Sequence, residues 1–451
     1  KKKKKKKKKA FHSIMKVFAL FVVFAVMAVL AIEVVSASSV THVPLTRRDR
    51  RAELRREHMK LRGEEGKSTV IPLRGNESRL GEYYMDFWLG NPRQHFTAQV
   101  DTGSSDLAIP RVGCGSCGSH PDAYYNPSKS SMSQSVGCSN SQHLTCPVCN
   151  HTQCAYEIRY GDGSGFDADV TVDALTISGL RPVTQAFGAI TSEENPGGGE
   201  FEPFPTDGII GFAYQALSEC KAPTPMDNLA ASGQVADIFS MCMTNDGGSM
   251  ALGGSGNWSH GEMQWTPIQK KLWYVVNVEG VSVGGESLGL GHFAYNGLSG
   301  AIVDSGTTFL ITSQAVWSAM EAKMKSHCQT TNLVGTCGAT SPLWNGRCIK
   351  MTDAQAAAYP DIEIQLSGSV TLTVPSALYL QKGLCGSPVY WAFAMAPAGT
   401  QGLLMGDTVM KGYEVVFDRV NSRIGFGSVL DSNNNIQCPD GNQAPPSSPT
   451  F

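Results

Sequence analysis

Charged residues are scarce in this chain of 451 residues, and long apolar runs are scarcer still. Asp, Glu, Lys and Arg supply 17% of the residues, which excludes the highly charged composition of a disordered protein. None of the ten histidines lies in a His-Glu-x-x-His motif, so a zinc protease of that type is not supported. The glycine-rich stretch 161–165 is not followed by Lys-Ser/Thr, which argues against a phosphate-binding loop. We expect neither a metal nor another cofactor.

Glycine, serine, threonine and valine are abundant instead. The 48 glycines and the 41% of hydrophobic residues indicate a globular protein with many turns. Low charge and frequent Ser, Thr and Val favour strands over long amphipathic helices. The length is sufficient for two domains of roughly 100–200 residues each. We predict a mostly β protein with helical patterns restricted to three segments, Met226–Ala231, Gln314–His327 and Asp353–Ala358.

The one long apolar run covers residues 17–35 and is interrupted only by Glu33. It ends in Val-Ser-Ala, which resembles a small-residue cleavage site, so we predict a signal peptide over 15–37. We interpret residues 1–14, which begin with nine lysines, as an artefactual segment. The alternative to a signal peptide is a signal anchor, because the run is long. Otherwise we expect no membrane association of the mature protein.

Charge is distributed unevenly along the chain. Residues 38–74 contain ten Lys or Arg against five acidic residues, whereas the chain from residue 75 contains 17 basic and 33 acidic residues, 17 − 33 = −16. A basic leader ahead of an acidic body predicts a prosegment that docks electrostatically on its own protein. The alternative is a solvated basic tail that binds anionic surfaces. We expect no nucleic-acid partner, because the main body is acidic.

A short acidic motif occurs twice in similar surroundings. Asp101-Thr-Gly-Ser-Ser and Asp304-Ser-Gly-Thr-Thr each follow an apolar run, and they are separated by 203 positions. Each is followed about a hundred residues later by two apolar residues and a glycine, at 209–211 and at 404–406. One such motif is an ordinary turn. Two matched units predict two similar lobes whose aspartates meet.

Two carboxyl groups in contact are suited to hydrolysis of a peptide bond without a metal. Their mutual repulsion keeps one protonated while the other is ionised, so one accepts a proton while the other donates one. We predict Asp101 and Asp304 as this catalytic pair. The neighbouring small residues would turn the chain, hydrogen-bond the carboxylates and join the two loops; they are Thr102, Gly103, Ser104, Ser305, Gly306 and Thr307.

These motifs resemble those of the pepsin family of aspartic endopeptidases. The similarity extends over roughly residues 80–427 and rests on five landmarks in order: Asp101-Thr-Gly-Ser, Tyr160-Gly161, Asp207–Tyr214, Asp304-Ser-Gly-Thr and Leu404–Phe426. The resemblance implies a bilobal β fold with a cleft between the lobes that holds an extended peptide. It also implies a hairpin flap over the substrate that carries Tyr160, Gly161 and Asp162. The start of the basic leader is similar to the family's inhibitory prosegment.

One position departs from the pattern that this resemblance implies. The family commonly has Trp seven residues after the first catalytic aspartate, where the ring N–H meets the flap tyrosine. This chain has Ala108 there. We therefore expect the position of the flap and the size of the substrate pocket to differ, while the chemistry of the aspartates is retained.

Thirteen cysteines behind a secretory signal imply disulfides, and their odd number leaves at least one thiol unpaired or bonded to another chain. Two Cys-x-x-Cys pairs allow a zinc site as an alternative, which the oxidising compartment disfavours. The cluster after the first aspartate is similar to the cysteine-rich subgroup that includes the plant nepenthesins. The disulfide candidates are Cys114, Cys117, Cys138, Cys146, Cys149, Cys154, Cys242, Cys348, Cys385 and Cys438.

Three Asn-x-Ser/Thr sequons also fit the secretory route and predict glycosylated surface sites at Asn76, Asn150 and Asn257. We expect an extracellular protein or one retained in an acidic vacuole or lysosome-like compartment. The predicted organisation is a signal peptide over 15–37, a prosegment over 38–74, an N-terminal lobe over 75–260, a C-terminal lobe over 261–438 and a disordered tail over 439–451.

Two other functions compete with proteolysis. Gly285-Glu-Ser-Leu-Gly289 matches the serine-hydrolase pattern Gly-x-Ser-x-Gly, but neither a buried strand before it nor a helix after it is predicted. A pepsin-like protein without activity could instead bind peptides or carbohydrates. Because this chain keeps both aspartates and their hydroxyl neighbours, we predict an acid-active, monomeric aspartic endopeptidase that is made as a zymogen and cleaves polypeptides.

Overall fold

The structure is a computed structural model, and it describes residues 69–74, 83–160, 163–177, 179–194, 206–399 and 401–439. All of these fall in the unit formed by residues 66–451. Several predicted features lie outside the described residues: the signal peptide, the prosegment before residue 69, the tail from residue 440, Asn76, Gly161 and Asp162. None of the described helices is long and apolar enough to cross a membrane.

Strands dominate the described residues, as the composition predicts. The N-terminal half contains β1 (Thr69–Leu73), β2 (Tyr84–Leu89), β3 (Gln94–Asp101), β4 (Leu107–Pro110), β5 (Gln134–Ser135), β6 (Val148–Asn150), β7 (Gln153–Arg159), β8 (Gly165–Ile177), β9 (Val183–Glu194), β10 (Gly208–Gly211), β11 (Ile238–Thr244) and β12 (Gly247–Leu252).

The C-terminal half continues with strands of similar length. These are β13 (Gln264–Pro267), β14 (Lys270–Lys271), β15 (Tyr274–Val276), β16 (Val278–Val283), β17 (Glu286–Ser287), β18 (Ala301–Val303), β19 (Leu310–Thr312), β20 (Ile349–Lys350), β21 (Ile362–Leu366), β22 (Val370–Val374), β23 (Leu380–Lys382), β24 (Tyr390–Phe393), β25 (Met395–Pro397), β26 (Leu404–Met405), β27 (Tyr413–Asp418) and β28 (Arg423–Ser428).

Helices are short, and the three predicted from the sequence are present. The described α-helices are α3 (Pro225–Ala231), α4 (His292–Asn296), α5 (Gln314–His327), α6 (Asp353–Ala356), α7 (Ser376–Tyr379) and α8 (Asp407–Met410), with 3-10 turns at Pro127–Lys129, Gln215–Leu217 and Pro342–Asn345. Helix α3 begins with a capping box in which the Thr224 side chain accepts from the Asp227 N–H. Helix α5 buries Val316, Met320 and Met324, the spacing of one helical face.

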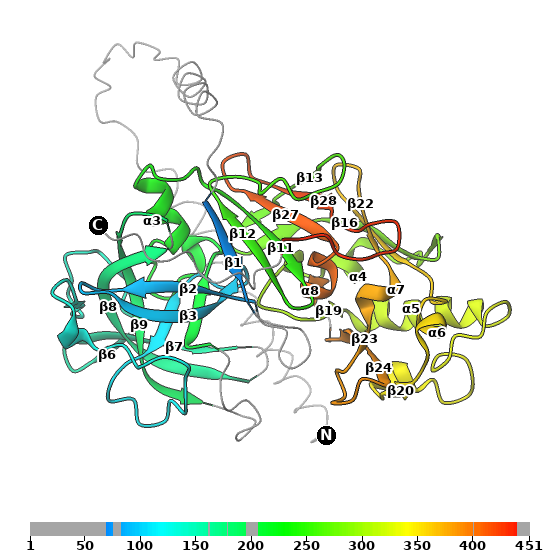
Figure 1. Cartoon of the computed structure of the whole chain (residues 1–451), viewed down its shortest axis with the longest axis horizontal. Coiled ribbons are helices and arrows are strands. Elements are labelled where there is room, and N and C mark those ends of the chain that lie inside the picture. Colours follow the sequence, from blue (N-terminus) through cyan, green and yellow to red (C-terminus); the bar gives the residue numbers. More distant parts are fainter. Residues whose placement is uncertain are drawn as a thin grey trace, which may run out of the picture. The chain divides into compact units, whose positions relative to one another are not determined.

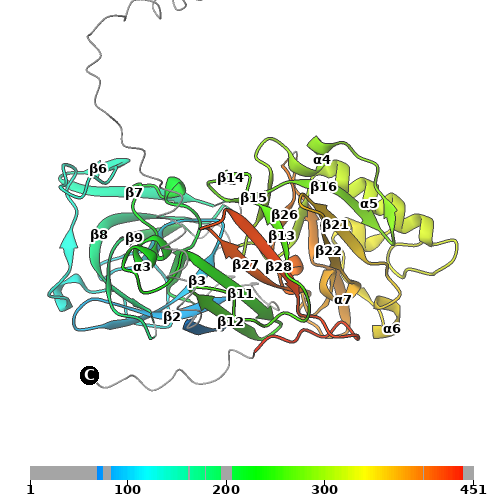
Figure 2. The same cartoon turned by 90° about the horizontal axis from the view of Figure 1, so that it is seen from above.

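A six-stranded sheet joins the two halves of the molecule. Its order is β1-β12-β11-β27-β28-β13, and β11 pairs antiparallel with β27 from Ile238 opposite Asp418 to Met241 opposite Val415. Figure 2 shows β11, β12, β27 and β28 side by side in this sheet. Strand β1 lies within the range predicted as prosegment and forms the edge of the sheet by pairing with β12.

Each half also builds its own sheets. A nine-stranded sheet of the N-terminal half runs β2-β3-β10-β4-β9-β8-β7-β6, with β5 paired to β8. In the C-terminal half the corresponding sheet runs β14-β15-β18-β26-β19-β25. Figure 1 shows the strands of the first sheet in blue to green and those of the C-terminal half in colours from green through yellow to red.

The two halves repeat one strand arrangement. In the N-terminal half β10 lies between β3, to which it is parallel, and β4, to which it is antiparallel. In the C-terminal half β26 lies in the same way between β18 and β19. The apolar residues of the apolar-apolar-glycine segments that follow each aspartate in the sequence lie in these inserted strands. The prediction of two similar β-rich lobes is therefore confirmed.

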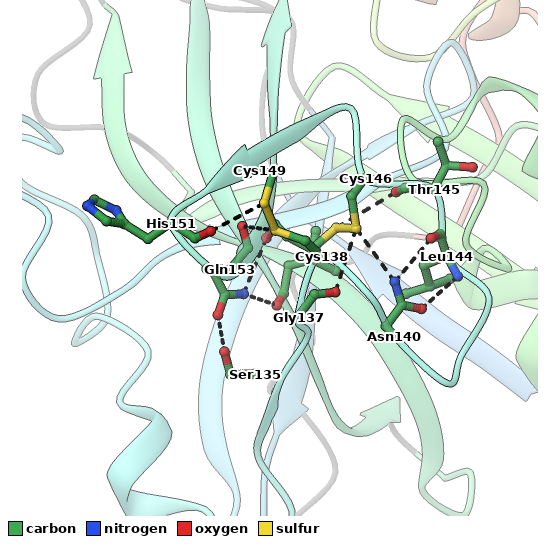
Figure 3. Close-up of a disulfide and its surroundings, with 12 residues drawn as sticks. Ser135, Gly137, Cys138, Asn140, Leu144, Thr145, Cys146, Cys149, His151 and Gln153 are labelled. Atoms are coloured by element: carbon green, nitrogen blue, oxygen red, sulfur yellow. Dashed lines mark hydrogen bonds between the residues drawn. A yellow bond between two sulfur atoms is a disulfide. The ribbon is translucent and has the colours of Figure 1, made fainter.

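Six disulfides link the cysteines of the described residues. The bonds are Cys114–Cys117, Cys138–Cys149, Cys146–Cys154, Cys242–Cys438, Cys328–Cys337 and Cys348–Cys385. Figure 3 shows Cys138 bonded to Cys149 beside Cys146, whose sulfur faces the Asn140 side chain. The two Cys-x-x-Cys pairs are thus consumed in disulfides and do not form a four-thiolate zinc site. Cys220 is the free, buried thiol.

Candidate active site

Asp101 is the last residue of β3, and its position is fixed by the inserted strand β10. Gly211 of β10 lies directly opposite Asp101 in the parallel register. The main-chain carbonyl of Asp101 accepts a hydrogen bond of 2.8 Å from Phe212 N–H. A Cβ on Gly211 would lie 2.6 Å from the Ser105 backbone, so this close approach requires glycine. The turn after β3 is therefore held tightly against β10.

Asp304 follows β18 and is positioned in the same manner. Its main-chain N–H donates a hydrogen bond of 3.1 Å to the Met405 carbonyl on β26. The glycine after that strand, Gly406, could not carry a Cβ, which would come within 2.7 Å of the Phe309 carbonyl oxygen. The same backbone construction thus presents an aspartate from each half.

The two carboxylates have matching hydrogen-bond partners. Gly103 N–H donates to Asp101 Oδ1 at 2.7 Å, and the Ser104 hydroxyl donates to Asp101 Oδ2. In the other half Gly306 N–H donates to Asp304 Oδ1 at 2.9 Å, and Thr307 Oγ1 donates to Asp304 Oδ2 at 2.7 Å. Each carboxylate thereby receives one backbone and one hydroxyl donor.

Thr102 and Ser305 join the two loops by reciprocal hydrogen bonds. Thr102 N–H donates to Ser305 Oγ at 3.1 Å, and Ser305 N–H donates to Thr102 Oγ1 at 2.9 Å. Each hydroxyl also donates to a carbonyl of the other half, Thr102 Oγ1 to Val303 at 3.2 Å and Ser305 Oγ to Val100 at 2.6 Å. Both side chains are fully buried, so their hydroxyls depend on this mutual pairing.

The two carboxyl groups face each other across this junction. A Cβ placed on Gly103 would lie 2.7 Å from the carboxyl carbon of Asp304, and one placed on Gly306 would lie 2.7 Å from that of Asp101. Each carboxyl group therefore packs on the glycine beside the other aspartate. Larger residues at 103 and 306 would force the carboxyl groups away from these positions.

Burial and the opposing carboxylate raise the pKa of Asp101. The residue is only 6% exposed, and loss of water is the largest cause that disfavours the ionised form. The negative charge of Asp304 raises the pKa further, while the hydrogen bonds from Ser104 and Gly103 lower it. The raised pKa means that this carboxyl keeps a proton at a pH where an ordinary aspartate has lost it.

The predicted flap is the hairpin that links β7 and β8. Tyr160 lies at its turn, where its N–H donates to the Ser164 carbonyl at 2.8 Å. The ring of Tyr160 contacts Phe166 at a centroid separation of 6.2 Å. Gly161 and Asp162 lie outside the described residues. Ala108 is fully buried on β4, opposite Gly188 of β9.

The remaining predicted residues are the glycosylation candidates and the disulfide candidates. Asn150 and Asn257 are both exposed, as an attached glycan requires, and Asn150 ends strand β6. All ten disulfide candidates are bonded. Cys328 and Cys337, which are not among those candidates, form a sixth bond within the C-terminal half. The spacing of cysteines along a chain does not give their pairing.

The ion pair of Arg419 is not among the site residues predicted from the sequence, although Arg419 and Tyr214 both lie within the family landmarks. Arg419, in the turn after β27, pairs with Asp227 of α3 at 2.6 Å and lies over the Tyr214 ring at 4.8 Å. The carbonyl of Tyr214 accepts from Ser105 Oγ at 2.7 Å, in the loop that follows Asp101. Arg419 thus links the C-terminal half to the support of Asp101, a contact across 192 positions that no local pattern reveals.

Comparison with known proteins agrees with this geometry. Residues 82–429 match the family model described as eukaryotic aspartyl protease. The chain belongs to this family. It is 28% identical over 358 residues to gastricsin from Homo sapiens, covering 77% of this chain and 81% of that protein. It is likewise 28% identical over 354 residues to pepsin A from Sus scrofa, with the same coverage.

A third relative matches at a similar level. The aspartic protease of Phaffia rhodozyma is 26% identical over 340 residues, which cover 75% of this chain and 74% of that protein. Since the family consists of aspartic endopeptidases, the chain is an aspartic-type endopeptidase by family. Among the described residues no group of three or more His, Cys, Asp or Glu side chains is arranged to hold a metal ion.

Proposed function

We propose that Asp101 and Asp304 form the catalytic dyad of an acid-active endopeptidase that cleaves polypeptides. The observation that carries the proposal is the reciprocal packing of each carboxyl group on the glycine beside the other. Two carboxyl groups this close cannot both ionise readily, so they share one proton. The raised pKa of Asp101 supports the same assignment.

The dyad would hydrolyse a peptide bond in two steps, water attack and C–N bond cleavage. The ionised carboxylate takes a proton from a water molecule while the water oxygen bonds to the peptide carbonyl carbon. The protonated carboxyl donates its proton to the carbonyl oxygen. When the C–N bond breaks, the proton taken from water passes to the leaving nitrogen, and one hydroxyl of the gem-diol intermediate returns a proton to the carboxylate that had protonated the carbonyl oxygen, which restores the starting state. Gly103, Ser104, Gly306 and Thr307 hold the carboxylates in orientation through the hydrogen bonds described above.

Replacement of either aspartate tests the dyad. Asp101→Asn and Asp304→Asn should each lower kcat by about 10²–10⁴-fold, the usual contribution of acid–base catalysis. The assay is cleavage of denatured haemoglobin at about pH 3–5, where carboxyl groups titrate. Asp361→Asn, an exposed aspartate of the C-terminal half, is the matched control and should keep full activity. Retained cleavage in either dyad variant would refute the mechanism. A folded wild-type protein that cleaves nothing would favour the peptide- or carbohydrate-binding alternative.

We further propose that the chain is made as a zymogen whose basic segment, residues 38–74, covers the acidic body. The opposite charge of the two parts supports this, with ten basic against five acidic residues in the segment. Acidification protonates the carboxylates of the body and weakens the pairing. We expect such a protein to enter the secretory pathway and to be either secreted or delivered to an acidic compartment. We expect its oligomeric state to be monomeric.

Acid treatment of the full chain tests the zymogen directly. N-terminal sequencing after exposure to about pH 4 should find a new N-terminus within or shortly after residues 38–74. The Asp101→Asn variant under the same conditions serves as the control, because it should trim far more slowly. An unchanged N-terminus in a wild-type protein that digests haemoglobin would contradict the zymogen while leaving the protease intact.

A further inference from the structure

Two small residues lie side by side on neighbouring strands of the N-terminal sheet. Ala108 of β4 lies opposite Gly188 of β9 in parallel register, so both positions face the same side of the sheet. Their neighbours on β4, Leu107 and Ile109, face the main hydrophobic core, whereas Ala108 faces a second cluster that includes Ala168 of β8. On β8 the residue paired with Gly188 is Val170, but Ala168 is a close diagonal neighbour, because a Cβ on Gly188 would lie 2.9 Å from its Cβ.

The aromatic ring of Tyr156 occupies the space that these small residues leave. Tyr156 on β7 lies directly opposite Ala168, and its ring extends to β9. A Cβ on Gly188 would lie 2.8 Å from the Tyr156 ring carbon that bears the hydroxyl. The ring is 3% exposed and belongs to the same cluster as Ala108. Gly188 therefore has to be glycine because the end of this ring covers it.

Tyr156 is connected to the flap tyrosine, Tyr160, through Phe166. Residues 156, 158 and 160 alternate along β7 and its extension and so share one face. Tyr156 and Tyr160 both contact Phe166, at centroid separations of 6.1 and 6.2 Å. A continuous aromatic path thus leads from Ala108 and Gly188 through Tyr156 and Phe166 to Tyr160.

We propose that Tyr156 is a positioning residue that supports the flap from the space beside Ala108. This inference rests on the proposed function, because it assigns how the flap of that protease is held. The ring, rather than the hydroxyl, carries the role. Within the described residues the buried Tyr156 hydroxyl has no hydrogen-bond partner, whereas the ring contacts Phe166 and its end lies against Gly188.

Removing the ring at position 156 and introducing one at position 108, singly and together, tests the proposal. Tyr156→Ala should raise KM by about tenfold with little change in kcat, because the flap loses its support. Ala108→Trp alone should lower Tm and raise KM, because Tyr156 already fills the site. In the Tyr156→Ala background the same Ala108→Trp change should raise Tm and lower KM. This reversal of sign is the expected result, and additive effects of the two changes would overturn the proposal.

Two further variants separate positioning from ordinary packing. Tyr156→Phe keeps the ring and should match the wild type in KM. Tyr359→Ala removes an equally buried tyrosine, also 3% exposed, from the C-terminal half and should lower Tm without changing KM. If Tyr156→Ala lowers Tm but leaves KM unchanged, as the Tyr359 control does, Tyr156 has only a packing role.

Failure of the proposed protease function would be recognised separately. A wild-type protein without cleavage would leave no KM to compare, yet thermal unfolding would still report whether Ala108→Trp reverses its effect on Tm in the Tyr156→Ala background. That reversal tests the packing of Tyr156 beside Ala108, and its absence would overturn the proposal without any measurement of activity.

Discussion

The two halves present their aspartates by the same construction but bury them differently. Strands β3, β10 and β4 are repeated by β18, β26 and β19, and each carboxylate receives one backbone and one hydroxyl donor. Asp101, however, is buried, whereas Asp304 is only half-buried. The N-terminal half adds the flap hairpin and three of the disulfides around it. The repeat thus gives both carboxylates the same hydrogen-bond donors, and what surrounds Asp101 makes their burial unequal.

The largest effect is expected when a side chain is added at the glycine on which the opposite carboxyl group packs. Gly103→Ala and Gly306→Ala should each reduce kcat by about a hundredfold, because the new Cβ would displace the opposite carboxyl group. The measurement is kcat on a peptide substrate at acidic pH. Gly115→Ala serves as the control, since its Cβ would meet nothing within 4 Å. If one glycine tolerates alanine and the other does not, the two halves are less alike than their hydrogen bonds indicate.

The hydroxyls that join the loops should have a smaller effect, on stability more than on chemistry. Thr102→Val and Ser305→Ala each leave buried backbone groups without a partner, at a cost of about 1–3 kcal/mol in the free energy of unfolding. Because the two residues bond each other, the double variant should lose less than the sum of the two single losses. Urea unfolding of all three variants measures this coupling. Strict additivity would mean that the two loops are held independently.

Much of this comparison could be predicted from the sequence. The doubled Asp-Thr/Ser-Gly motif and its apolar-apolar-glycine partners are local patterns, so the residues of β3, β10, β18 and β26 can be recognised from their order along the chain. The contact of Arg419 with Asp227 could not be found in this way, because it depends on how β27 pairs with β11. The filling of the space beside Ala108 by Tyr156 depends likewise on the register of four strands.

The inequality of the aspartates predicts how stability depends on pH. Since folding raises the pKa of Asp101 above its ordinary value of 3.8, the folded protein binds this proton more tightly than the unfolded chain does. The free energy of unfolding should therefore fall as pH rises from about 3.8 to the raised pKa. Asp101→Asn should remove this contribution. Asp304→Asn should remove only the part of this pH dependence that comes from the effect of the Asp304 charge on the pKa of Asp101. Unfolding curves between about pH 4 and pH 7 measure both slopes. Equal slopes in the wild type and Asp101→Asn would contradict the assignment.

The smallest effect on stability is expected at the free thiol. Among the described cysteines, the only free one lies in the N-terminal half. Cys220 is 2% exposed in the cluster that includes Ala108 and Tyr156, and burial raises the pKa of its thiol to about 12. A buried, protonated thiol reacts slowly. The folded protein should leave a thiol reagent unreacted at about pH 8, close to the ordinary pKa of a cysteine. It should react once in denaturant. Cys220→Ala should change the free energy of unfolding by only about 1 kcal/mol, since it removes little apolar volume. Rapid reaction of the folded protein would show that the region beneath the flap opens, which would make the N-terminal half the less rigid of the two.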